Sequence, residues 1–113
     1  MATPATGFDV YAEAPPAREA WQVGLALVKC STAWCGPCKS IAPTFLAFAQ
    51  AQLAGELRCY ETDADVDQDF AARYSIRVLP TFLLLQDEIE QGRVEGADWD
   101  AVLALVRRSS PTV

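Results

Sequence analysis

The stretch STAWCGPCK, residues 31–39, decides the fold because it joins a short apolar segment to a long helical pattern. The segment LALVKCS (25–31) predicts a buried strand, and residues 36–54 carry apolar side chains at helical spacing. A strand that runs into a helix places Cys35 in the first turn, where unpaired backbone N–H groups and the helix dipole stabilise a thiolate. Cys38 follows one turn later, close enough to form a disulfide with Cys35.

The rest of the chain alternates between helical and extended patterns. A short helix is predicted at residues 14–24 and another at 65–75, with further strands at 56–63, 81–86 and 88–96. This order predicts an α/β fold, a central mixed β-sheet with helices on both faces. The last helix begins after an N-cap at Asp98, and its predicted apolar face holds Trp99, Val102, Leu103 and Val106.

The length and the net charge of the chain limit the classes of protein to which it can belong. A chain of 113 residues predicts a single domain over residues 1–113, with residues 1–7 flexible. The net charge of −6 argues against a nucleic-acid surface, and the apolar run LPTFLLL is too short to span a bilayer. We find no secretory-signal pattern, and four unevenly spaced cysteines suggest a reducing compartment. We therefore expect a cytoplasmic monomer without nucleic-acid or membrane partners.

Three motifs carry a resemblance to a known family. The block WCGPCK resembles the active-site motif of the thioredoxin family residue for residue, and IRVLPTFLLL and VEGAD are similar to two further family segments. The resemblance implies the thioredoxin fold and a cis peptide bond before Pro80. It also implies that the backbone of Leu79 pairs with a substrate strand. Trp34, Gly96 and Ala97 are then expected to line the same substrate groove.

The resemblance also implies a reaction, thiol–disulfide exchange on disulfide-containing protein substrates. Cys35 as thiolate attacks a partner disulfide, and Cys38 then resolves the mixed disulfide and releases the reduced partner. Gly36 and Pro37 keep the turn between the two cysteines tight and so tune the pair. The expected activity is that of a thioredoxin-type protein-disulfide reductase. It needs no bound cofactor, and a separate reductase is expected to supply its electrons.

Lys29 departs from the family pattern. It occupies the position where thioredoxins usually carry a buried aspartate, and Cys59 occupies the position of the lysine that usually faces it. A nearby cation favours thiolates, so Lys29 would make the dithiol more oxidising. The alternative is that Lys29 pairs with a carboxylate such as Glu61 or Asp63 and has no effect on the reaction.

The other two cysteines are expected to fill apolar space, as free cysteines commonly do. Cys30 follows Lys29 along the strand and therefore points to the opposite face. Lys29 and Cys59 are expected to share a face. A disulfide between Cys30 and Cys59 is therefore not expected.

Two rival functions remain open from the sequence. Cys30, Cys35, Cys38 and Cys59 have the spacing of a plant-type 2Fe–2S ferredoxin, and four thiolates also suit zinc. Against a metal site, an extended strand should carry Cys30 away from the other thiols. The second rival is a thioredoxin-fold adaptor that binds partners without turnover. The intact WCGPCK block argues against it, because packing does not require cysteines at these positions.

Overall fold

Helices and strands alternate along the chain in the computed structural model, which describes residues 20–52 and 57–109. All four predicted strands are present, and each predicted helix has a helical counterpart. The elements are η1 (Ala20–Gln22), β1 (Leu25–Ser31), α1 (Gly36–Ala51), β2 (Arg58–Asp63), α2 (Gln68–Arg73), β3 (Thr81–Gln86), β4 (Ile89–Glu95) and α3 (Trp99–Ser109).

The four strands form one mixed sheet in the order β2-β1-β3-β4. β1 runs parallel to β2 and antiparallel to β3, and β3 and β4 form an antiparallel hairpin. The hairpin turns at Asp87 and Glu88, whose φ angles of 51° and 74° are those of a two-residue turn that matches strand twist. The register places Cys30 opposite Thr81, so the carboxyl end of β1 lies beside the start of β3.

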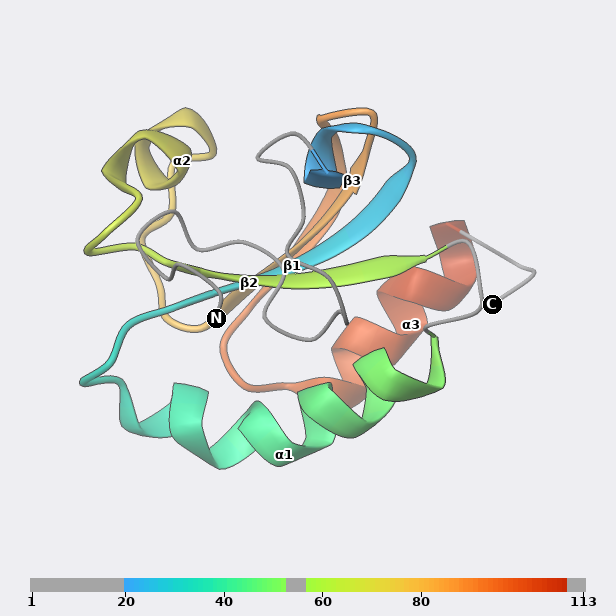
Figure 1. Ribbon diagram of the computed structural model, residues 1–113. Helices are drawn as coiled ribbons and strands as arrows, with labels where there is room; N and C mark the ends of the chain where they lie inside the picture. Colours follow the sequence, from blue (N-terminus) through green and yellow to red (C-terminus); the bar gives the residue numbers. More distant parts are fainter. Residues whose placement is uncertain (1–19, 53–56, 110–113) are drawn as a thin grey trace.

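Helices cover both faces of the sheet, as the sequence predicted. α1 and α3 pack on one face, and η1 and α2 pack on the other (Figure 1). Side chains alternate along β3, so Phe82 and Leu84 join the α1–α3 cluster while Leu83 and Leu85 join the opposite one. The two clusters explain why the central strands are apolar almost throughout.

The helix α1 carries the predicted site at its N-terminus and spans 16 residues. It begins at Gly36 with Pro37 in its first turn, where the backbone N–H that proline lacks would have no partner within the helix. The helix continues through Pro43. Ile41, Phe45 and Ala49 seat it against the sheet. No helix within residues 20–52 and 57–109 is both long and apolar enough to cross a membrane.

Two details differ from the sequence prediction. Within the predicted helix 14–24, the structure has a short 3₁₀ helix at Ala20–Gln22. Residues 14–19 lie outside the described range, and so do residues 1–7, which the sequence predicted to be flexible.

On α3, the prediction that Leu103 belongs to the buried face is wrong in part. Leu105 is buried there and Leu103 is only half-buried. The helix is therefore rotated slightly about its own axis relative to the prediction, so that Leu105 faces the sheet. Asp98 does cap this helix, since its carboxylate accepts the Ala101 N–H.

Candidate active site

Cys35 and Cys38 are joined by a disulfide at the start of α1. Their Cα atoms lie 5.3 Å apart, a normal separation for a disulfide. Cys35 is the N-cap of the helix, and its Sγ accepts a hydrogen bond of 3.2 Å from the Cys38 N–H. One of the unpaired N–H groups of the first turn therefore points at this sulfur. The same contact will stabilise the Cys35 thiolate when the disulfide is reduced.

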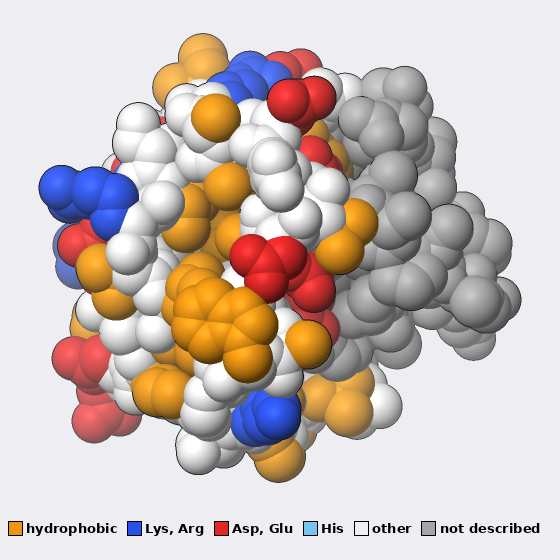
Figure 2. Space-filling view, turned by 90° about the vertical axis from the view of Figure 1, so that its left-hand side faces the viewer, with side chains coloured by type: hydrophobic (Ala, Val, Ile, Leu, Met, Phe, Trp, Pro, Cys, Tyr) orange, Lys and Arg blue, Asp and Glu red, His pale blue; other side chains and the backbone are white. Residues whose placement is uncertain are grey.

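An apolar surface surrounds the disulfide. Trp34 is 68% exposed although it is a large aromatic residue, and Val66 and Val78 are also exposed. The indole N–H of Trp34 donates a 2.7 Å hydrogen bond to Asp65, which fixes the ring against the loop after β2. Figure 2 shows the end of the molecule that carries this surface, with acidic side chains beside the apolar ones. An exposed and immobilised aromatic ring of this kind suits contact with a partner chain.

The segment before β3 lies at the same end of the sheet as the disulfide. The Leu79–Pro80 peptide bond is cis, as the resemblance implied. Pro80 is buried and Leu79 is half-buried. The N–H of Gly96 donates a 2.8 Å hydrogen bond to the Pro80 carbonyl, and Gly96 has a φ of +107°, which favours glycine. The structure therefore brings the predicted segments 79–80 and 96–97 together, with Ala97 exposed.

Lys29 is almost completely buried, at 1% exposure, and it forms an ion pair with Glu61. Its Nζ lies 3.1 Å from the Glu61 Oε2, and the Ser31 hydroxyl donates to the same oxygen at 2.9 Å. The ammonium also lies 5.8 Å from the centre of the Phe45 ring on α1. Of the two carboxylates that the sequence suggested, Glu61 is the partner, because it stands opposite Lys29 in the β1–β2 register.

The two remaining cysteines form no disulfide and are buried on opposite faces of the sheet. Cys59 belongs to the cluster under α1 and α3, and Cys30 belongs to the cluster under α2, as strand alternation predicted. Burial raises the pKa of the Cys30 thiol far above its ordinary value. A site built from all four cysteines is not formed, and within the described ranges no group of three or more ligating side chains is placed to hold a metal ion.

Sequence reasoning did not find two polar contacts that shape the site. One is the hydroxyl of Ser31 on Glu61, and the other is the carboxylate of Asp65 on Trp34. Strand alternation could have indicated the first, because Ser31 lies two residues after Lys29 and so shares its face. The second depends on how the loop after β2 folds back beside residue 34, which no local pattern encodes.

The fold and the paired cysteines define a thiol–disulfide oxidoreductase, and comparisons with known proteins agree. The family model described as Thioredoxin matches residues 18–108. Thioredoxin Asp f 29 of Aspergillus fumigatus is 34% identical over 74% of this chain and 76% of its own length. The X-ray structure of Fasciola hepatica thioredoxin matches with a TM-score of 0.72 at 32% identity, over 80% of this chain and 86% of that one. Chlamydomonas reinhardtii thioredoxin f2 matches with a TM-score of 0.73 at 29% identity, over 82% and 85%.

This chain belongs to the thioredoxin family. Its Cys35–Cys38 pair therefore carries out thiol–disulfide exchange with disulfide-containing substrates.

Proposed function

We propose that this protein works chiefly as a reductase of disulfide bonds in partner proteins. The observation that supports Cys35 as the sulfur that attacks a partner disulfide is its position as the N-cap of α1, against the Cys38 N–H. A thiolate that a helix N-terminus stabilises is a good attacking group at neutral pH. The exposed apolar surface around it gives a folded or unfolded partner a place to dock.

The proposed exchange moves two electrons from the dithiol to the partner. The Cys35 thiolate attacks one sulfur of the partner disulfide, forming a mixed disulfide, and the partner's other sulfur leaves as a thiolate and takes up a proton. Cys38 then loses its proton and attacks the Cys35 sulfur. The second partner sulfur leaves and is protonated, and Cys35 and Cys38 remain joined as in this structure.

In this proposal the partner lies across Trp34 and the segments 79–80 and 96–97. Trp34 offers a flat apolar contact, and the backbone of Leu79 pairs with the partner in the manner of an added strand. Pro80, Gly96 and Ala97 form the adjoining wall. The hydrogen bond from the Gly96 N–H to the Pro80 carbonyl supports this arrangement, because it holds the two segments side by side.

Three further points belong to the proposal. A separate reductase resets the disulfide, since Cys30 and Cys59 lie on opposite faces of the sheet and cannot relay electrons to each other. The protein acts as a monomer. It works in the cytoplasm, where the reducing poise keeps buried thiols such as that of Cys30 reduced.

We also propose that Lys29 tunes the dithiol. Its buried ammonium lies on the sheet face that α1 covers, and the paired Glu61 offsets part of its charge. Lys29→Asp is expected to make the dithiol less oxidising, and Lys29→Met should change the potential in the same direction but less. Equilibration of each variant with glutathione measures the potential. Equal potentials in wild type and both variants would reject this role.

The direct test of the function is reduction of insulin with dithiothreitol as the electron source. Wild type should reduce insulin far faster than dithiothreitol alone. Cys38→Ser should stop turnover and instead accumulate a mixed disulfide at Cys35, which intact-mass spectrometry detects. A wild-type rate at background would contradict the proposal and favour a non-catalytic adaptor.

A further inference from the structure

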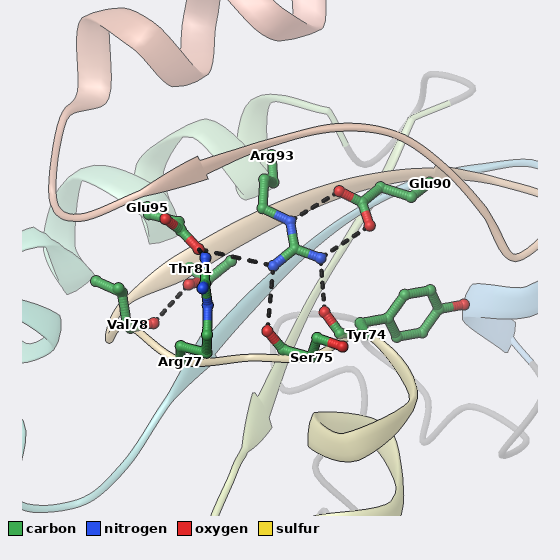
Figure 3. A network of polar contacts seen from close by, with 8 residues as sticks. All are labelled: Tyr74, Ser75, Arg77, Val78, Thr81, Glu90, Arg93 and Glu95. Atoms are coloured by element: carbon green, nitrogen blue, oxygen red, sulfur yellow. Dashed lines mark hydrogen bonds and ion pairs between the residues drawn. The ribbon is translucent and has the colours of Figure 1, made fainter.

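An open cleft lies beside the segments that the proposed function assigns to partner binding. It has a volume of about 600 Å³ and is lined by Ser75, Arg77, Arg93 and Glu95. Ser75 and Arg77 come from the segment between α2 and β3, and Arg93 and Glu95 come from one face of β4. Figure 3 shows Arg93 in the middle of the polar network of this cleft, between Glu90 and Glu95.

Arg93 is a fixed wall of the cleft. Its Nε and Nη2 donate to the two carboxylate oxygens of Glu90 at 2.8 and 2.9 Å, a bidentate pair. Nη2 also donates to the Tyr74 carbonyl at 2.6 Å, which ties β4 to the end of α2. The hydrogen bonds from Arg93 lower the pKa of Glu90, as expected for a lasting pair. These contacts leave Arg93 little freedom to turn toward a ligand.

Arg77 is held much more weakly. Its side chain is 76% exposed, and its ion pair with Glu95 has an N–O distance of 3.6 Å. The same Glu95 oxygen lies 3.8 Å from Arg93, so two guanidinium groups share one carboxylate. An exposed pair of this kind contributes little to stability, so a second carboxylate can replace Glu95 on Arg77 at small cost. A guanidinium group is also well suited to bind a carboxylate through two parallel hydrogen bonds.

The cleft adjoins the dithiol end of the sheet. Arg77 precedes the cis Leu79–Pro80 bond by two residues, and Glu95 directly precedes Gly96, whose N–H is bonded to Pro80. In the sheet order, these residues lie on the β3–β4 side of the end of β1. The loop after β2, with the Asp65 that holds Trp34, lies on the other side. The surface around the disulfide thus has an acidic flank and a flank with a loosely held cation.

We propose that Arg77 is a specificity-determining residue that binds a carboxylate side chain of the partner protein close to the partner's disulfide. Glu95 holds Arg77 when no partner is present and is displaced when one docks. Arg93 and Ser75 form the fixed walls of this subsite. The proposal rests on the proposed function, because it assumes that partners lie across the segments 79–80 and 96–97.

Two synthetic peptides with the same intramolecular disulfide test the proposal, one with Glu and one with Gln at the positions that flank the cysteines. The ratio of their kcat/KM values, acidic over neutral, is measured for wild type, Arg77→Gln and Glu95→Gln. Arg77→Gln should lower the ratio about twofold to fivefold, the range of a single exposed ion pair. Glu95→Gln should raise it, because the competing carboxylate is gone. Both differences should fade in 1 M salt.

Arg58→Gln is the matched control, since it removes one positive charge at the far end of β2 from the dithiol. The ratio should stay at the wild-type value in this variant. An unchanged ratio in Arg77→Gln, or an equal fall in Arg58→Gln, would overturn the proposal. If wild type reduces neither peptide, the proposed direction of the reaction fails. NMR titration with the reduced peptides then decides on Arg77, which should bind the acidic one more tightly in wild type than in Arg77→Gln.

Discussion

Cys30 and Cys35 lie five positions apart in the chain and are both buried, at 0% and 4% exposure, yet the backbone around them differs. Cys30 sits in the middle layer of the sheet, fully buried among the side chains of Val28, Tyr60 and Leu83. Cys35 sits where β1 has ended and α1 begins, bonded to Cys38 at the end of the molecule with the exposed Trp34. The comparison separates a cysteine used for packing from one used for chemistry.

Backbone context, more than composition, makes a cysteine reactive. Burial penalises the Cys30 thiolate more than the nearby Arg93 favours it, which explains the raised pKa of Cys30. A helix start does the opposite, because its free N–H groups and dipole favour the anion. One short loop between strand and helix is enough to change the outcome.

Cys30 and Cys35 should differ most in their contribution to turnover. Cys35→Ser should lower the rate of insulin reduction by at least about a thousandfold, because the attacking sulfur is lost. Cys30→Ala should leave the rate unchanged and should cost about 1 kcal/mol of unfolding free energy for the small cavity it creates. Steady-state assays and urea unfolding of the two variants give these numbers. A large loss of rate in Cys30→Ala would remove the distinction.

The ion pair between Lys29, next to Cys30, and Glu61 is expected to affect the free energy of unfolding. Lys29→Met should lower the free energy of unfolding by about 2 kcal/mol, since Glu61 is 26% exposed and can regain water. Glu61→Leu should cost more, about 3 to 4 kcal/mol, because it leaves the buried ammonium of Lys29 without its carboxylate. Urea unfolding at pH 7 measures both. The order of the two losses is the critical result, and the reverse order would show that Lys29 is not confined as the structure indicates.

The smallest effect concerns pH. Because burial raises the pKa of Cys30 above its ordinary value of 9.0, the folded protein keeps a proton that the unfolded chain releases. The stability from this difference is complete below pH 9 and is lost as the pH rises above it. Between pH 8 and pH 10, wild type should lose about 1.4 kcal/mol more unfolding free energy than Cys30→Ala. Equal losses would mean that Cys30 is not shielded from water.

Much of this contrast could be predicted from the sequence, because it depends on local patterns. The apolar run 25–31 and the helical spacing after residue 36 fix the strand, the helix and the cysteine between them. Strand alternation places Cys30 and Lys29 on opposite faces, and the family resemblance places Cys59 on the face of Lys29. The family motifs add the cis bond at Pro80, which no periodicity indicates.

The remaining features depend on register and on long-range placement. Glu61 and Asp63 are equally good partners for Lys29 until the β1–β2 register is known, and a slip by one residue would put both on the wrong face. The cleft around Arg77 requires the segment after α2 to lie against β4, a contact between parts of the chain that share no local signal. The choice of Leu105 over Leu103 follows from the rotation of α3 on the sheet.

Alkylation tests whether the start of α1 creates a reactive thiolate at Cys35. The reduced, folded protein is treated with iodoacetamide across pH 5 to 10, and modification of each cysteine is followed by mass spectrometry. We predict that the rate at Cys35 reaches half its plateau below about pH 7.5, while Cys30 stays unmodified. A half-plateau for Cys35 at about pH 8.5 to 9, the range of a free thiol, would contradict this claim.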